Sequence, residues 1–199
     1  MAVDVTPDWV AVVLAVVVVL VALAWYLTWS AGRLDRLHHR VQGARGALGN
    51  QLLRRAAAAA DLASSGVLDP ASSVLLAAAA GEALEAAEEE GLDPQAPLDR
   101  DLARREAAES DLSRVLRATL GDPDVVRTLR ADPVGTDLLD ALDAACLRVV
   151  LARRFHNDAV WQAQRVRGKR VVRWTRLAGR APMPQTVEID DEPPDLSGV

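Results

Sequence analysis

Residues 9–29 form an apolar run that contains no charged side chain, WVAVVLAVVVVLVALAWYLTW. As an α-helix that rises 1.5 Å per residue, a run of this length covers roughly the 30 Å hydrocarbon core of a bilayer. Aromatic side chains suited to the two membrane interfaces lie at its ends: Trp9 at one, and Trp25, Tyr26 and Trp29 at the other. The sequence therefore predicts a single transmembrane helix over residues 9–29.

A cleaved signal peptide and a buried core helix are the alternative interpretations of this run. A signal peptide favours a basic stretch ahead of a shorter apolar segment, whereas Asp4 and Asp8 precede this run and no basic residue does. A core helix at the surface of a bundle carries a polar face, and none interrupts this run. We therefore interpret the run as a membrane anchor.

The arginines that follow the run predict which way the chain crosses the membrane. They stand at Arg33, Arg36, Arg40 and Arg45, and the positive-inside rule places such a segment in the cytoplasm. We expect a single-pass protein of the cytoplasmic membrane, with a short extracytoplasmic N-terminus (residues 1–8). The single Cys146 excludes an internal disulfide and fits a reducing compartment.

The rest of the chain is expected to be helical. Alanine, leucine and arginine dominate its composition, and Asp-Pro pairs that start helices occur at residues 69–70, 93–94, 122–123 and 132–133. An aspartate there accepts a free N–H of the first turn, and proline has no N–H to lose. With glycines at 66, 91 and 121 as stops, the sequence predicts helices over about 7–65, 70–90, 97–120, 123–130 and 134–177.

Apolar residues spaced by three and four predict that these helices pack as a bundle. One stripe comprises Leu34, Leu37, Val41, Ala44, Leu48 and Leu52, and a second comprises Leu138, Leu142, Ala145, Val149, Ala152, His156, Ala159, Ala163 and Val166. The predicted fold is all-α: the N-terminal transmembrane helix continues into an antiparallel up-and-down bundle of three to four long helices, within residues 30–180. Residues 181–199 contain four prolines, and we expect an acidic, flexible or extended tail.

Charge is distributed in blocks along the chain. Residues 33–55 and 148–180 are basic, whereas residues 82–111 and the tail 188–195 are acidic. The two basic blocks and the acidic middle neutralise one another if the helices pack side by side.

Three stretches resemble the LemA family. LHHRVQGARGALGNQLLRR (37–55) is similar to the family's first cytoplasmic helix, and ESDLSRVLRATLGDPDVVRTLRADPVGTDLLDAL (109–142) to its Glu, Leu-Ser and Pro-Asp pattern. ARRFHNDAV (152–160), followed by VEID (187–190), is similar to its last helix and acidic C-terminal motif. The chain departs from the family pattern at Arg45, His156, Ala163 and Gln164. The resemblance implies an antiparallel helical bundle behind one N-terminal span, without an established catalytic activity or cofactor.

The stretch ARRFHNDAV also raises the question of an active site. A metal site would need His38, His39, His156 and Asp158, but neighbours on a helix point about 100° apart and do not face one ion easily. Cys146 and His156 lie ten residues apart, about 15 Å along one helix, which is too far for a nucleophile and its base. We therefore expect no enzyme, metal or cofactor, and interpret His156 as a packing residue.

The basic end of the last predicted helix is the candidate contact site. Its residues are Arg165, Arg167, Lys169, Arg170, Arg173 and Arg176, among apolar residues that would suit anionic phospholipid headgroups. The sequence leaves open whether this end lies near the membrane. We expect a non-enzymatic, membrane-anchored scaffold or adaptor that binds itself, a protein partner or anionic lipid. The alternative is a membrane-tethered nucleic-acid-binding protein that uses residues 165–176, which the overall acidity disfavours.

Overall fold

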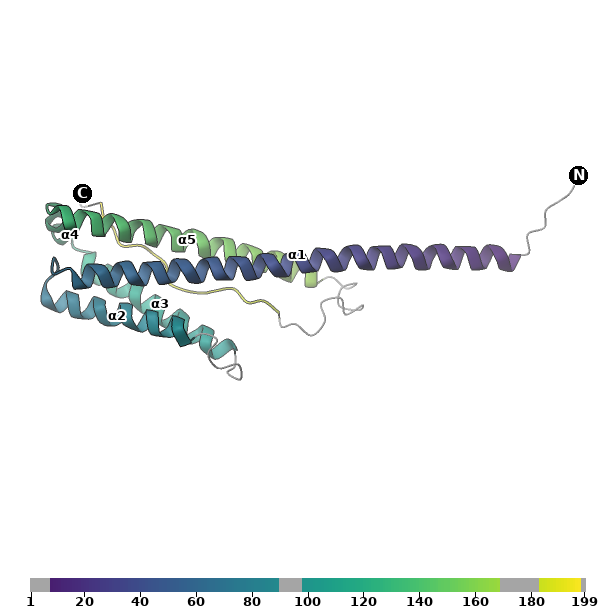
Figure 1. Ribbon diagram of the computed structural model, residues 1–199, viewed down its shortest axis with the longest axis horizontal. Coiled ribbons are helices and arrows are strands. Elements are labelled where there is room, and N and C mark those ends of the chain that lie inside the picture. The colour runs from purple at the N-terminus through teal and green to yellow at the C-terminus, as the bar shows by residue number, and fades with distance from the viewer. Residues whose placement is uncertain (1–7, 90–97, 169–182, 198–199) are drawn as a thin grey trace, which may run out of the picture.

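The structure is a computed structural model that describes residues 8–89, 98–168 and 183–197. These residues form no strand, and their helices are α1 (Asp8–Ser64), α2 (Pro70–Glu89), α3 (Leu98–Leu120), α4 (Pro123–Arg130) and α5 (Pro133–Arg167). The long helices run up and down beside one another, and the apolar half of α1 projects beyond them (Figure 1). The all-α fold is confirmed. The predicted extension of the last helix to residue 177 lies outside the described residues.

Aspartate caps set where the helices begin, as the Asp-Pro pairs predict. Asp69, Asp122 and Asp132 accept backbone N–H groups of the following turn at 2.9–3.2 Å, and the pair at residue 93 lies outside the described residues. Gly66 has a φ of 79°, a left-handed conformation that ends α1 and that other residues adopt only with strain. Local capping therefore accounts for the starts of α2, α4 and α5 and for the end of α1.

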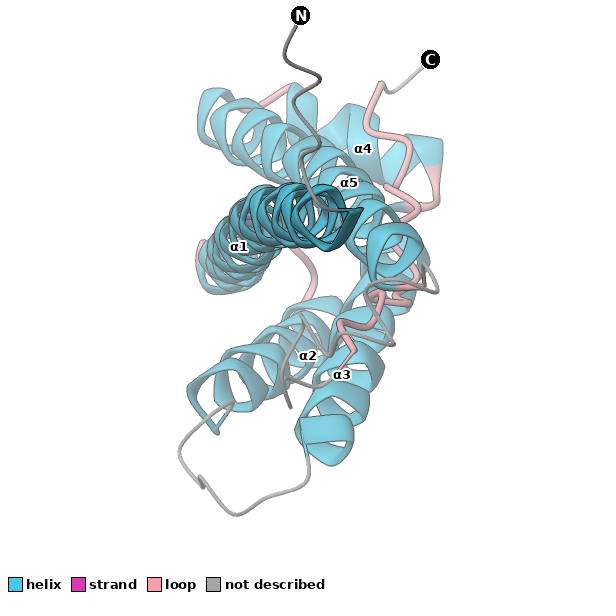
Figure 2. Cartoon of the chain, turned by 90° about the vertical axis from the view of Figure 1, so that its right-hand side faces the viewer, coloured by secondary structure: helices cyan, strands magenta, loops and turns pink. Residues whose placement is uncertain are grey.

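The helices pack as an open arc. α1 lies against both α5 and α2, and α2 lies against α3, whereas the backbones of α3 and α5 do not come within 8 Å (Cα to Cα) of each other in the described part of the chain (Figure 2). α5 runs antiparallel to α1 and returns toward its apolar half (Figure 1). One side of the bundle is therefore left open between α3 and α5.

Alanine and leucine fill the core, as the two predicted stripes require. In α5, every residue of the stripe from Leu138 to Val166 is buried or half-buried, and so are the described stripe residues of α1. Small alanines let α1 and α2 approach closely, while leucines supply most of the apolar area. The main cluster includes Ala56, Ala59, Leu62, Leu76, Ala80, Leu112, Leu116, Leu120, Leu139 and Leu142.

The N-terminal part of α1 is one apolar helix that the bundle does not cover. Its segment Trp9–Tyr26 is long and apolar enough to cross a membrane, and none of it is buried within the chain. The first buried residue of α1 among those described is Val41. This N-terminal helix is compatible with a single membrane anchor or a signal sequence.

Of the two predicted alternatives for the C-terminal tail, flexible or extended, its described part adopts the extended one and packs against the helices. Residues 183–197 are extended and non-helical, but Val187, Ile189 and Leu196 are buried against the helices. Four prolines remove helical propensity from residues 181–199 without preventing an extended segment from packing. Alternate apolar residues within the acidic segment supply the buried contacts. We call residues 183–197 the C-terminal strap.

Candidate functional site

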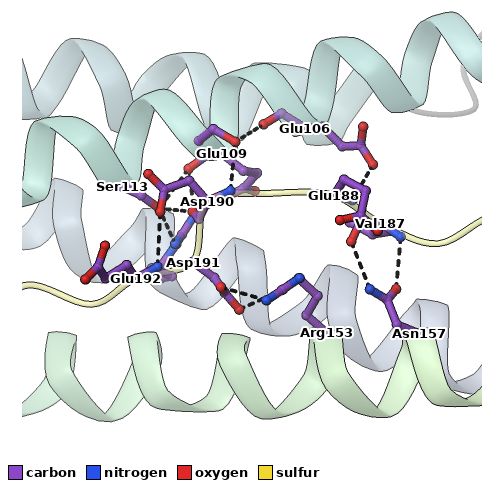
Figure 3. A network of polar contacts seen from close by, with 12 residues as sticks. Glu106, Glu109, Ser113, Arg153, Asn157, Val187, Glu188, Asp190, Asp191 and Glu192 are labelled. Atoms are coloured by element: carbon purple, nitrogen blue, oxygen red, sulfur yellow. Dashed lines mark hydrogen bonds and ion pairs between the residues drawn. The ribbon is translucent and has the colours of Figure 1, made fainter.

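The C-terminal strap lies in the gap that the helices leave between α3 and α5. Figure 3 shows it between the two helices, with polar side chains reaching it from both. Val187 and Ile189 of the strap form one apolar cluster with Leu48 and Leu52 of α1 and Val149 of α5. The strap thus completes the core where α3 and α5 do not meet. We call the site that holds the strap the strap groove. It is formed by α3, α4, α5 and the part of α1 around Leu48 and Leu52.

Side chains of the groove bind the main chain of the strap. Asn157 of α5 donates to the Val187 carbonyl at 3.1 Å and accepts the Val187 N–H at 2.9 Å. On α3, Glu106 accepts the N–H of Glu188 at 2.8 Å (Figure 3). Ser110, also on α3, accepts the N–H of Asp190 at 3.1 Å. These contacts hold an extended backbone and leave the strap's side chains to determine specificity.

Further main-chain contacts lie at the two ends of the strap. Gln164 of α5 donates to the Pro184 carbonyl at 2.8 Å, and Arg130 of α4 donates to the Leu196 carbonyl at 2.9 Å. Since Pro184 lies near the C-terminal end of α5 and Leu196 near α4, the strap runs antiparallel to α5 along most of its length.

Two consecutive aspartates of the strap meet one arginine from each wall of the groove. Arg153 of α5 holds Asp191 through two hydrogen bonds, at 2.7 and 2.9 Å. Arg117 of α3 pairs with Asp190 and also donates to the Glu192 carbonyl at 2.9 Å. The hydrogen bond from Arg117 is the main cause that lowers the pKa of the Asp190 carboxyl, and the carboxylate in turn raises the pKa of Arg117.

A buried ion pair connects α1 to α3, one of the two helices that border the strap. Arg55 and Glu109 are 2% and 1% exposed, which is rare for charged side chains, and the Arg55 guanidinium donates to the Glu109 carboxylate at 2.7 Å. Arg55 also donates to the Ser113 hydroxyl at 2.8 Å, and that hydroxyl lies 2.5 Å from the carbonyl of Asp190. A polar chain therefore runs from the core of the bundle to the strap.

A small cavity lies beside this ion pair. Its volume is about 40 Å³, and its walls include Leu48 and Leu52 of α1, Leu102 of α3 and Ile189 of the strap. Pockets for small organic ligands measure on the order of 300–1,000 Å³. The cavity is therefore a packing gap on the scale of water, and the space between α3 and α5 is used by the strap itself.

The predicted basic contact site is only partly described. Arg165 and Arg167 lie in the last turn of α5, with Arg165 exposed and Arg167 half-buried. Lys169, Arg170, Arg173 and Arg176 lie outside the described residues. A hydrogen bond of 3.2 Å from Arg40 of α1 to Gln162 places this end of α5 on the side of the apolar half of α1. In the described part of α5, Arg153 pairs with the strap rather than with the acidic residues 82–111.

His156 is buried on the packing stripe of α5, as expected, and is 2% exposed. Burial is the main cause that lowers the pKa of His156. A hydrogen bond to the Gln185 backbone raises this pKa by less, and the charge of Arg45 lowers it further. Burial also raises the pKa of the Cys146 thiol to about 11, so the thiol stays protonated at neutral pH. No group of three metal-ligating side chains occurs among the described residues. His156 and Cys146 therefore both belong to the buried face of α5.

The buried His156 predicts a loss of stability on mild acidification. Its folded pKa lies below the ordinary value of 6.5, so the unfolded chain takes up this proton more readily. The contribution of the neutral His156 to the free energy of unfolding is complete above about pH 6.5 and is lost as the pH falls through the folded pKa. The free energy of unfolding falls there by at most about 1.4 kcal/mol per pH unit. Urea unfolding between pH 7.5 and 5 measures this slope.

The matched substitutions for this measurement are His156→Gln and His38→Gln. His156→Gln is expected to flatten the slope between pH 6.5 and 5, whereas the same change at the exposed His38 preserves it. An unchanged slope in the His156→Gln chain would contradict the assignment.

Asn157 predicts how firmly the strap is held. Asn157→Ala removes both partners of the Val187 backbone, and unpaired buried polar groups cost about 1–3 kcal/mol. We expect hydrogen exchange at strap amides to accelerate about tenfold or more, with α1 and α2 unaffected. Asp158→Ala, at the exposed neighbouring position, is the control. Equal exchange in both variants would show that Asn157 does not hold the strap.

Sequence reasoning did not identify Arg55, Glu109 or the strap as a site. A signal was present, because Arg55 stands on the stripe of Leu48, Leu52 and Ala59, and Glu109 stands three residues before Leu112. Opposite charges on two apolar stripes indicate a buried pair when those stripes face each other. The pairing could not be assigned without knowing which helices are neighbours.

Comparison with known proteins adds no assignment to this geometry: no family model, no curated protein and no solved structure matches the chain.

Proposed function

We propose that the chain is a single-pass membrane-anchored scaffold or adaptor, not an enzyme, similar to proteins of the LemA family. Its helical bundle lies in the cytoplasm and associates with itself, a protein partner or anionic lipid. Residues 9–29 anchor the chain in the membrane, and the four arginines that follow orient it with its N-terminus outside.

The observation that carries this proposal is the continuity of α1. One helix of 57 residues contains both the uncovered apolar segment and, from Val41 onward, the buried face against which α5 and α2 pack. A signal sequence is cut from the domain that it exports, whereas an anchor stays joined to it, and the apolar segment and the bundle here share one continuous helix. Such a helix supports the bundle at a fixed distance from a bilayer.

The end of α5 supports the anionic-lipid part of the proposal. Since Arg40 lies opposite Gln162 and α5 runs antiparallel to α1, Arg167 stands about 9 Å along the axis from the level of Trp29. That separation is close to the Debye length of about 8 Å at physiological ionic strength, so Arg165 and Arg167 would sense an anionic surface. Each such residue contributes about 1 kcal/mol near the headgroups.

A charge in the middle of the apolar segment tests the anchor. Val18→Arg places a guanidinium near the centre of Trp9–Tyr26, at a cost of about 2.5–3.5 kcal/mol for insertion. We expect the wild-type chain to stay in membranes through alkaline carbonate extraction at its full-length mass. For Val18→Arg, we expect the ratio of extracted to membrane-bound chain to be about a hundredfold higher than for the wild type. For Val18→Ala, we expect no increase in this ratio.

Two outcomes would contradict the proposal. Recovery of the wild-type chain in the soluble fraction would remove the anchor, and a mass that lacks the first thirty residues would identify a signal sequence. The intact mass and the extraction are measured on the same sample, so the two outcomes are separable.

A further inference from the structure

We infer that the strap groove also binds the C-terminal strap of a second copy of this chain, so that neighbouring molecules exchange straps. The inference rests on the proposed function, because it supplies the mode of self-association of a membrane-anchored scaffold. The ligand is an extended segment with alternate apolar residues followed by two acids, as in Val187 to Asp191.

The groove is built to recognise a peptide. Side chains of α3, α4 and α5 bind eight main-chain groups of the strap. These are the N–H groups of Val187, Glu188 and Asp190 and the carbonyls of Pro184, Val187, Asp190, Glu192 and Leu196. Specificity comes from apolar contacts of Val187 and Ile189 with α1 and α5 and from the two arginine–aspartate pairs. This is the division of labour by which domains bind extended peptides: main-chain bonds give affinity and alternate side chains give selectivity.

The groove needs an occupant. Since the backbones of α3 and α5 do not approach each other in the described part of the chain, the strap covers the apolar residues of α1 and α5 that lie between them. Without a strap, Leu48, Leu52 and Val149 would line an open apolar channel, with Arg117 and Arg153 unpaired on its two walls. A segment of matching sequence is present on every copy of the chain, and the second copy is therefore the occupant to which we commit.

The geometry allows the exchange between copies in one membrane. The strap begins beside Gln164, at the end of α5 that returns toward the apolar half of α1 (Figure 1). Anchored copies present their grooves at the same height. The 14 residues from 169 to 182 connect α5 to the strap, and they span at most about 50 Å when fully extended. Two packed helices measure about 20–24 Å across, so a neighbouring groove is within reach.

The energetics also permit the exchange of straps between copies. An exchanged strap makes the same contacts as a strap bound within its own copy, so only the loss of freedom on association opposes pairing. Confinement to one bilayer raises the effective concentration of the partner and reduces that cost.

Two complementary variants of the full chain test the exchange in reconstituted vesicles. The first carries Val187→Asp and Ile189→Asp, which disable its strap but leave its groove intact. The second carries Arg117→Glu and Arg153→Glu, which disable its groove but leave its strap intact. With different affinity tags, we expect the mixed pair to co-purify at least about tenfold above either variant mixed with itself. Adding Val187→Asp and Ile189→Asp to the second variant is the matched control and is expected to abolish recovery; recovery equal to that control overturns the inference.

A cross-linking measurement keeps the test independent of how well those variants fold. One otherwise wild-type copy carries Arg153→Cys and the other carries Asp191→Cys, and a short bis-maleimide joins them only when the strap crosses between copies. Cys146 is 3% exposed and does not compete. Arg154→Cys, at the exposed neighbouring position, replaces Arg153→Cys in the control. A mixed product specific to position 153 supports exchange, and its absence, or equal product from position 154, refutes it.

Failure of the exchange is distinguishable from failure of the anchor. Carbonate extraction of the same vesicles reports whether the chain is anchored, whatever the cross-linking shows. Chains that resist extraction but yield no mixed product refute the exchange alone.

Discussion

Replacing Arg55 by methionine is expected to destabilise the bundle by about 3–5 kcal/mol. The substitution keeps most of the side-chain volume but leaves Glu109, 1% exposed, as a buried carboxylate without its partner. It also removes the donor to the Ser113 hydroxyl, and so interrupts the polar chain that reaches Asp190 of the strap. The free energy of unfolding in urea, measured on the full chain in micelles, gives the loss.

Two further variants separate the ion pair from other effects of the substitution. Arg54→Met makes the same change at the exposed neighbouring arginine, and we expect it to cost less than about 0.5 kcal/mol. Arg55→Met combined with Glu109→Leu replaces the pair by apolar side chains and is expected to recover most of the loss, since a buried pair is often no more stable than its apolar substitute. If Arg55→Met costs no more than Arg54→Met, the buried pair does not stabilise the bundle.

The helices and their boundaries were accessible from sequence because their causes are local. An aspartate at Asp69, Asp122 or Asp132 caps the turn that follows it, and Gly66 supplies the left-handed conformation that ends α1. The apolar spacing that places His156 inside α5 is also local. Patterns of this kind predict helices and their buried faces without knowledge of the neighbours.

The strap groove was not accessible because its causes are non-local. Prolines and acids between 181 and 199 indicate only that this segment is not helical. Its packing depends on the gap between α3 and α5, and on Arg117 and Arg153, which are more than thirty residues away in sequence. An acidic tail remains in solution when no basic groove faces it. Composition alone does not distinguish the two cases.

The same distinction applies to the charge blocks. Mutual neutralisation of basic and acidic segments was expected from their order, and Arg55 with Glu109 is one such pair. The partner of Arg153, however, is Asp191 of the strap rather than a residue of 82–111, because the strap lies between the backbones of α5 and α3 there. Charge patterning therefore predicts that pairs form, whereas the arrangement of the helices decides which ones.

The helices without their strap are the natural comparison for the strap variants. A chain that ends after residue 182 keeps α1 to α5 but leaves the apolar channel beside Val149 open. The free energy of unfolding that this chain loses, relative to the full chain, measures the whole docking free energy of the strap. No substitution within the strap can cost more than this amount.

Substitutions in the strap are accordingly expected to reach a limit when combined. Ile189→Ala is expected to cost about 2–4 kcal/mol and Asp191→Asn about 1–3 kcal/mol, the latter through loss of a bidentate pair. Once the strap has left the groove, a second substitution in it costs nothing more, so the double variant should fall short of the sum and not exceed the truncated chain. Ile189→Ala combined with Leu76→Ala, in the α2 part of the core, should instead add fully. Additive losses within the strap, measured by urea unfolding, would show that it unfolds together with the helices rather than as a separate segment.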